Sequence, residues 1–313
     1  MQTIQFPYYT ADGPPRTSPA PLPAPDRGRL SAPDHYMPDK DLVAAVNVAL
    51  LLGQPILLTG EPGTGKTQLV YHVSWKLGYG EPLLFETKST STARDLFYTY
   101  DTVGRFQATQ TGRSTEDKDY LTYNALGLAI IYANDSKDVE GMLPEGFPHP
   151  GPKRRSVVLI DEIDKAPRDF PNDILNEVEG MYFKVAELGH RKFEAEPDMR
   201  PILFMTSNSE KHLPDAFLRR CVYYHIQFPG EEQLKEIVVK RLGQFTRDSR
   251  FLTEAVSFFY KLRRLEGLTK KPATAELLGW LHYLTERGAP RRLAPRPRRQ
   301  GQGRARRHRQ RHA

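Results

Sequence analysis

The sequence is poor in cysteine and in long apolar runs. Cys221 is the single cysteine among 313 residues, so no intramolecular disulfide can form, as is typical of a reducing compartment. No apolar run approaches the roughly 20 residues that cross a bilayer as a helix, and the N-terminus lacks the basic-then-apolar pattern of a secretory signal. These absences exclude a disulfide-stapled fold and a helical membrane protein, and they indicate a cytoplasmic protein. Cys221, next to Val222, is expected to be a small buried hydrophobic residue.

The positive charge of the chain belongs to one segment. The net charge is +7, but residues 289–313 contain ten arginines and no acidic residue, so the remainder carries 7 − 10 = −3. A basic balance ordinarily indicates a nucleic-acid partner. Here the body is slightly acidic, and nucleic acid is expected to bind only nonspecifically, through this tail. The tail is either a nucleic-acid-binding arm or a non-native terminus produced by a frameshift in GC-rich DNA, and the abrupt change in composition favours the frameshift.

Composition divides the chain into four parts. Residues 1–34 contain eight prolines and are expected to form a disordered leader. Residues 35–228 alternate apolar strands with helical patterns, which predicts a parallel sheet covered by helices on both faces. Residues 229–287 hold three helical patterns and no strand, which predicts a small all-α lid domain. Residues 288–313 cannot make a packed core and are expected to be disordered.

The hydrophobic periodicity predicts individual elements within these parts. Strands are expected at 55–59, 83–85, 156–160, 202–205 and 222–228. Helices are expected at 39–52, after the glycine-rich loop at 60–67, at 125–132 and at 168–179. Residues 181–195 alternate like a β-hairpin, whereas residues 87–125 are polar and are expected to be irregular.

The most informative motif is a glycine-rich loop between a strand and a helix. Residues 60–67 read Gly-Glu-Pro-Gly-Thr-Gly-Lys-Thr and fit GxxxxGKT, the phosphate-binding loop. An apolar run precedes the loop and a helical pattern follows it, so backbone N–H groups and the positive end of the helix dipole converge on an anion. The side chain of Lys66 can reach the β- and γ-phosphates, and the hydroxyl of Thr67 can ligate Mg²⁺. The residues predicted to bind ATP are Gly60, Glu61, Pro62, Gly63, Thr64, Gly65, Lys66 and Thr67.

An acidic pair ends another apolar strand. Residues 157–162 read Val-Val-Leu-Ile-Asp-Glu, which places two carboxylates at the edge of the sheet where ligands bind in open α/β folds. Asp161 can hold Mg²⁺, and Glu162 can polarise the water that attacks the γ-phosphate. Such a pair is often only a solvated turn. The phosphate loop upstream favours a nucleotide site.

Two further polar features follow. Asn208 lies in the polar residues that follow the strand expected at 202–205, and it could bond the attacking water or the γ-phosphate; its alternative role is that of a turn residue. Arg219 and Arg220 end a short helical segment, and their planar guanidinium groups match phosphate oxygens. The alternative is a pair of surface arginines at a helix C-terminus.

These motifs, in this order, resemble an AAA+ ATPase, and more narrowly the MoxR-like, dynein-related branch, over residues 36–286. The resemblance implies a P-loop NTPase fold in which Asp161 and Glu162 form the Walker B motif and Asn208 is sensor 1. It implies Arg220 as the arginine finger, with Arg219 as the fallback. It also places a hairpin before sensor 1, at 181–195, and a helix 2 insertion near 95–106.

The resemblance further implies an ATPase that uses ATP and Mg²⁺, assembles into a homo-oligomeric ring with a hexamer as the expected size, and remodels an unidentified protein client as a chaperone. One departure concerns the lid, because residues 271–276 lack the sensor 2 arginine that this family usually carries. Either Lys270 or Lys271 substitutes, or the lid senses nucleotide weakly. A nucleotide-dependent scaffold with weak hydrolysis, consistent with the missing arginine, remains an alternative. So does a nucleic-acid motor that uses the hairpin and the arginine-rich tail.

Overall fold

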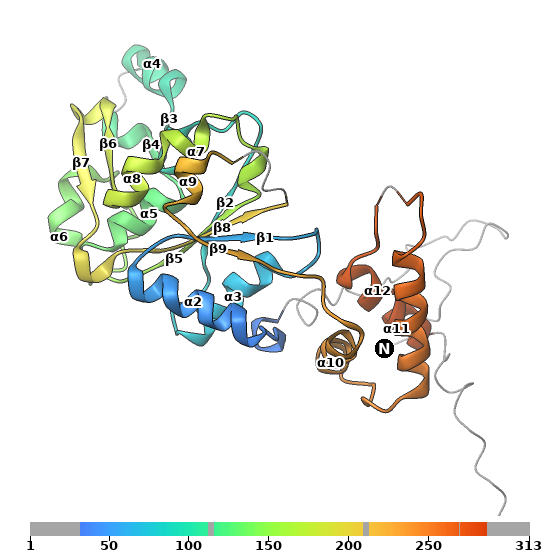
Figure 1. Cartoon of the computed structure of the whole chain (residues 1–313). Helices are drawn as coiled ribbons and strands as arrows, with labels where there is room; N and C mark the ends of the chain where they lie inside the picture. Colours follow the sequence, from blue (N-terminus) through green and yellow to red (C-terminus); the bar gives the residue numbers. More distant parts are fainter. Residues whose placement is uncertain (1–31, 112–115, 209–212, 269, 287–313) are drawn as a thin grey trace, which may run out of the picture.

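A computed structural model describes residues 32–111, 116–208, 213–268 and 270–286 (Figure 1). Apart from its last residues, the predicted leader lies outside these ranges, and so does the arginine-rich tail. The central element is a five-stranded sheet in the order β2-β5-β8-β1-β9, in which all paired strands are parallel. Its strands are β1 (Ile56–Thr59), β2 (Leu83–Glu86), β5 (Val157–Asp161), β8 (Ile202–Ser207) and β9 (Val222–His225). The carboxyl ends of β1, β5 and β8 therefore meet at one edge.

Helices cover both faces of this sheet, as the sequence predicts. Side chains of successive strand residues point to opposite faces, so Leu57 packs into one hydrophobic core, whereas Ile56 and Leu58 pack into another. The second core includes α2 (Lys40–Leu52) and α3 (Lys66–Lys76). The first includes α5 (Ala125–Tyr132), α7 (Phe170–Asp173), α8 (Leu175–Gly180) and α9 (Asp215–Leu218), with the short α6 (Ser136–Val139) at its margin (Figure 1).

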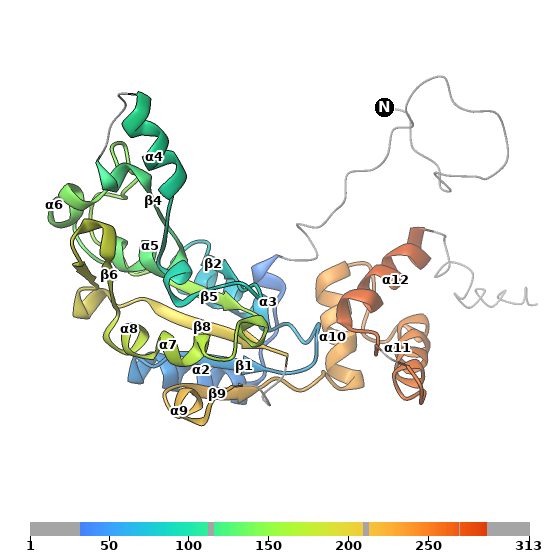
Figure 2. The same cartoon turned by 90° about the horizontal axis from the view of Figure 1, so that it is seen from above.

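The segment between β2 and α5 is more ordered than its composition indicates. It contains β3 (Tyr98–Tyr100), α4 (Thr102–Thr111) and β4 (Leu121–Tyr123), so the expectation of irregular structure is wrong here. β3 and β4 pair antiparallel across α4, a long-range pairing that local polarity does not reveal. Helix α4 projects away from the sheet (Figures 1 and 2). The insertion expected near 95–106 overlaps these elements.

Three other predicted boundaries differ from the structure. The single helix expected at 168–179 is two short helices that meet at Ile174, whose φ of −92° and ψ of −5° depart from regular α-helical values. The strand expected at 222–228 ends at His225, after which Phe228 packs against the C-terminal helices. The strand expected at 202–205 continues to Ser207, since Thr206 and Ser207 still pair with β1.

The predicted hairpin is confirmed. β6 (Tyr182–Val185) and β7 (Arg191–Glu194) pair antiparallel, with Tyr182 opposite Glu194 and Val185 opposite Arg191. The inward side chains of Phe183 and Phe193 stack with their ring centroids 4.9 Å apart, and both belong to the larger core.

The C-terminal helices form a group with their own core. α10 (Glu231–Leu242), α11 (Arg250–Arg263) and α12 (Thr274–Glu286) surround buried leucines and valines, among them Leu234, Val256 and Leu277. The group lies beside the carboxyl edge of the sheet and is reached from β9 (Figures 1 and 2). Within the described ranges, every helix is too short or too polar to cross a membrane.

Candidate nucleotide-binding site

A cavity of about 610 Å³ opens where the carboxyl edge of the sheet faces the C-terminal helices. This volume is within the range of small-molecule sites. The cavity wall combines the glycine-rich loop, the ends of β5 and β8, and residues of α10 and α12. The predicted residues in the wall are Pro62, Gly63, Thr64, Gly65, Lys66, Thr67, Asp161, Glu162 and Asn208.

The glycines of the loop are required by its close packing. Gly60 and Gly63 have φ of +142° and +77°, values that favour glycine. A Cβ at Gly60 would collide with the carbonyl oxygen of Ile226, and one at Gly63 with the side chain of Ala273 in the lid. Helix α3 then begins at Lys66, so its free N-terminal amides face the cavity.

Lys66 is held inside this loop. The residue is 7% exposed, and its Nζ donates to the carbonyl oxygens of Gly60 at 2.8 Å and Glu61 at 3.2 Å. A third bond, 2.9 Å long, runs to Oδ1 of Asn208. Burial lowers the pKa of Lys66, and the negative charge of Asp161 opposes this effect. Lys66 lies in the cavity wall, so a phosphate oxygen that enters the cavity can replace one of the carbonyl partners of its ammonium group.

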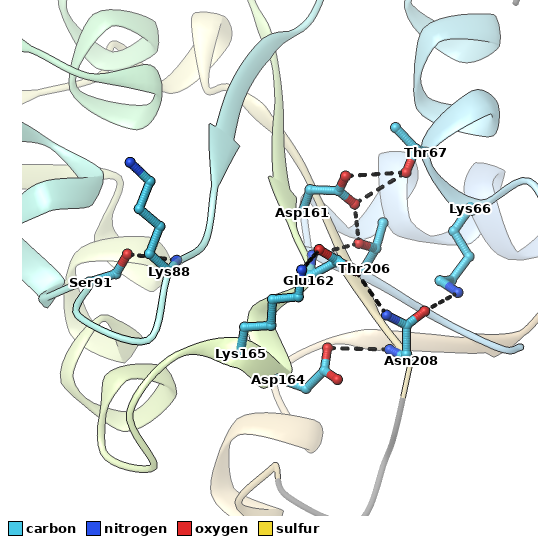
Figure 3. Close-up of polar contacts among 10 residues, drawn as sticks. All are labelled: Lys66, Thr67, Lys88, Ser91, Asp161, Glu162, Asp164, Lys165, Thr206 and Asn208. Carbon is cyan, nitrogen blue, oxygen red and sulfur yellow. Dashed lines mark hydrogen bonds and ion pairs between the residues drawn. The ribbon is translucent and has the colours of Figure 1, made fainter. Parts of the chain in front are cut away.

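Thr67 and Asp161 form a candidate site for Mg²⁺. The hydroxyl of Thr67 donates to Oδ1 of Asp161 at 3.1 Å, which brings a hydroxyl and a carboxylate together (Figure 3). Mg²⁺ prefers oxygen ligands and keeps several waters, so one or two protein oxygens and the phosphates suffice. In the described ranges, no group of three or more histidine, cysteine or acidic side chains is placed so that it could hold a metal ion by itself. The donor set fits a nucleotide-bound Mg²⁺ rather than a metal held by protein alone.

The backbone turns sharply at Glu162, directly after β5. This residue has φ 55° and ψ 51°, a left-handed conformation that is uncommon outside glycine. Its carboxylate accepts from Nδ2 of Asn208 at 3.1 Å and from the ammonium group of Lys165. The bond from Lys165 is the main reason that the pKa of Glu162 lies below its ordinary value. Glu162 is therefore ionised at neutral pH and able to accept a proton.

Asn208 joins the two halves of the site. Its side-chain oxygen accepts from Lys66 while its nitrogen donates to Glu162, and its backbone N–H donates to Oδ1 of Asp164 at 3.2 Å (Figure 3). One amide therefore spans the space between the phosphate-loop lysine and the acidic pair.

Arg219 and Arg220 lie elsewhere. Both follow α9, are exposed, and are absent from the cavity wall. Nε of Arg220 donates to Oε2 of Glu179 at 3.1 Å, whereas Arg219 forms no ion pair or side-chain hydrogen bond with any described residue. The chain does not bring these arginines to its own nucleotide site.

A contact between the lid and the loop is not evident from the sequence. Nη2 of Arg263, on α11, donates to Oε2 of Glu61 at 2.5 Å, and its guanidinium lies 3.5 Å from the ring centroid of Phe228. The side chain of Arg263 is 9% exposed. Of the two lysines proposed to replace sensor 2, Lys270 lines the cavity and Lys271 does not.

Thr206 and Lys165 also contact the acidic pair, and neither contact was predicted from the sequence. The hydroxyl of Thr206 accepts from the backbone N–H of Glu162, and the ammonium group of Lys165 donates to the side-chain carboxylate of Glu162. The available signal for Thr206 was a hydroxyl inside a strand of buried residues, since buried polar groups are almost always hydrogen-bonded.

The fold and the site together define a P-loop nucleotide-binding protein. A strand, a glycine-rich loop and a helix form the phosphate site, and an acidic pair on a parallel strand of the same sheet faces it. Residues 55–221 match the AAA domain of the dynein-related subfamily, and this match spans more than half of the chain. The chain therefore belongs to the dynein-related subfamily of AAA domains.

Comparisons with other proteins add less detail. Similar solved structures include a closed-state Hsp104 with ATPγS and FITC-casein (18% identity, TM-score 0.47) and an ADP complex of Hsp104 from S. cerevisiae (18%, 0.46), each sharing 81% of this chain and 45% of its own. The FIGL-1 AAA domain with ADP is 18% identical with a TM-score of 0.38, over 77% of this chain and 63% of its own. The chain thus spans less than two thirds of each. No protein of curated function matches it.

Proposed function

We propose that the protein binds Mg-ATP and hydrolyses it to ADP and phosphate, as a P-loop ATPase. The observation that carries this proposal is the double contact of Asn208, which bonds both Lys66 and Glu162. A scaffold that only bound nucleotide would have no need to couple the phosphate-binding lysine to a candidate base. The eight residues from Gly60 to Thr67 are proposed to hold the triphosphate.

In the proposed reaction, Glu162 accepts a proton from water while the water oxygen attacks the γ-phosphorus and the bond to the ADP oxygen breaks. Asn208 orients that water, and Lys66 holds the β- and γ-phosphates. Thr67 and Asp161 would hold Mg²⁺, which neutralises charge on the phosphate oxygens when it is bound.

The test is the Glu162→Gln variant. Glutamine keeps the shape and can still bond Asn208, but it cannot take the proton. We expect Mg-ATP to bind as in the wild type while steady-state phosphate release nearly stops. Normal turnover by this variant would remove Glu162 as the base.

We further propose that hydrolysis requires a neighbouring subunit, in a homo-oligomeric ring expected to be a hexamer. The exposure of Arg220 and Arg219, away from this chain's own cavity, supports a role in trans. Such an arginine contributes roughly 10³–10⁵ in rate in related phosphoryl transfer. Activity per subunit should then rise steeply with protein concentration. A rate that stays constant while sedimentation shows a monomer would exclude action in trans.

The order of motifs and the hairpin before Asn208 support a MoxR-like assignment, with a cytoplasmic chaperone that remodels a protein client. Affinity capture with ATP-loaded Glu162→Gln protein tests this, with Lys66→Ala as the matched control that cannot hold the triphosphate. Clients should be retained by the first variant and released from the second. Equal recovery on both would argue against nucleotide-dependent client binding.

A scaffold with weak hydrolysis is the second candidate, because the start of α12 carries no arginine and Lys270 is the only described residue of the preceding segment 264–273 that lines the cavity. Phosphate release measured above the concentration at which the ring assembles separates the two. A rate that remains at background there would favour the scaffold.

A further inference from the structure

Thr206 is a polar residue at the buried end of the central strand β8. It is 0% exposed and pairs with Leu58 of β1, one residue beyond the last paired position of β8 with β5. All six residues of this strand are buried. A hydroxyl in such a place must find partners within the protein, because an unpaired buried polar group is costly.

Both partners of Thr206 belong to the acidic pair. Its Oγ1 accepts from the backbone N–H of Glu162 at 2.9 Å and donates to Oδ1 of Asp161 at 2.5 Å (Figure 3). A hydroxyl offers one donor and two acceptor sites, so this single atom can serve both partners. Valine offers neither function, whereas the hydroxyl of serine offers both.

The contact to Glu162 falls on a residue other than glycine whose backbone is left-handed. A left-handed residue other than glycine costs of order 1–2 kcal/mol and persists only where the surroundings hold it. Here the turn directs the chain away from β5, and the side chain of Glu162 meets Asn208. A bond to the N–H of this very residue stabilises the turn.

The contact to Asp161 fixes the neighbouring carboxylate. Oδ1 of Asp161 accepts hydrogen bonds from the hydroxyl groups of Thr206 and Thr67. Two donors on one oxygen restrict rotation of the carboxylate about its last bond.

We propose that Thr206 is a positioning residue for the hydrolytic reaction: its hydroxyl holds the left-handed turn that aims Glu162 and the orientation of the Asp161 carboxylate. The inference rests on the proposed ATPase function. Thr206 itself does not touch the reacting atoms in this mechanism and acts through its two neighbours.

The experiment compares Thr206→Val, which keeps the shape and loses the hydroxyl, with Thr206→Ser, which keeps the hydroxyl and loses the methyl group. We expect the valine variant to lose about 10- to 100-fold in kcat, the effect of one or two buried hydrogen bonds. Its affinity for ATP in EDTA, measured by calorimetry, should stay within about threefold of wild type because the contacts of Lys66 are intact. The increase in ATP affinity on adding Mg²⁺ should shrink. The serine variant should retain kcat within about threefold.

A double-variant cycle with Glu162→Gln separates positioning from packing. If Thr206 acts through Glu162, the valine substitution should slow the residual single-turnover hydrolysis of the glutamine background only a little. Equal damage by valine and serine, with equal loss of Tm, would instead mark a packing role and overturn the inference, as would wild-type kcat in the valine variant. Should the valine variant fail to fold, Thr206→Ala removes the same hydroxyl without burying a methyl group against a carboxylate.

Failure of the underlying function has a different signature. A wild-type protein that binds Mg-ATP without turnover, at a concentration above that at which the ring assembles, would refute the ATPase proposal. In that case, the Mg²⁺-dependent affinity of the valine variant still decides whether Thr206 orients Asp161: a reduced effect supports this part of the inference and an unchanged effect refutes it.

Discussion

Replacing Asn208 with alanine removes two bonds of the site at once. Its amide oxygen bonds Lys66 at 2.9 Å and its amide nitrogen bonds Glu162 at 3.1 Å. Lys66 keeps the carbonyl oxygens of Gly60 and Glu61, and Glu162 keeps Lys165. Neither charged group is therefore left unpaired, so the fold and ATP binding should change little.

The magnitude follows from the strength of these bonds. A hydrogen bond to a charged group contributes roughly 1.5–3 kcal/mol. The side chain of Glu162 is 37% exposed, so solvent screening weakens its bond to Asn208 to a free energy near or below the lower limit of this range. About 1.4 kcal/mol corresponds to a tenfold change in rate. We expect kcat to fall about 10- to 100-fold while the affinity for ATP stays within about threefold.

The assay is steady-state phosphate release with calorimetric ATP binding on the same preparation. Asn172→Ala, an exposed asparagine on α7, is the matched control and should behave as wild type. Asn208→Asp adds a second test, because its carboxylate would face Glu162 and raise the pKa of that base. The acid limb of the pH profile should then move to higher pH. Unchanged kcat in Asn208→Ala would refute the bridging role.

The remaining predictions concern residues around the site. Lys165→Met removes the main cause of the low pKa of Glu162, so this pKa should rise. The acid limb of the pH profile of kcat/KM should then move to higher pH, and an acid limb at the wild-type pH would contradict this. Arg263→Met removes the contacts to Glu61 and Phe228 and should lower the free energy of unfolding by about 1–3 kcal/mol in urea titrations; Glu61→Gln, which can still accept from arginine, should cost less. Burial raises the pKa of Cys221 to about 12. Its thiol should therefore label slowly at pH 8 until the protein unfolds. The free energy of unfolding should fall as pH rises from about 8.5 towards 12, by up to about 1.4 kcal/mol per pH unit, because only the unfolded thiol ionises there; equal labelling of folded and unfolded protein would contradict this.

The sequence predicted the parts of the site that depend on local patterns. The loop at 60–67 and the strand ending in Asp161 are contiguous, and each carries its own strand or helix context. The five sheet strands and the two faces of helices follow from apolar runs separated by helical periods. The hairpin at 181–195 also showed its alternation directly.

The missed features depend on contacts between distant segments. Arg263 lies 202 residues from its partner Glu61, and Thr206 lies 44 residues from Glu162. Nothing local distinguishes these side chains from an ordinary helix arginine or a strand threonine. The β3–β4 pair was missed for the same reason, since neither three-residue strand is stable without the other. The break at Ile174 divides a pattern that reads as one continuous helix.

The central claim is that the glycine-rich loop and Lys66 hold the phosphates of Mg-ATP. Titration of Mg-ATP by calorimetry into folded wild-type protein and into Lys66→Ala tests it most directly. We predict one site per chain in the wild type and at least about 100-fold weaker binding in the variant, the effect of losing charged hydrogen bonds to phosphate. A wild-type sample that is folded by circular dichroism yet shows no binding heat at any temperature tested would contradict the account.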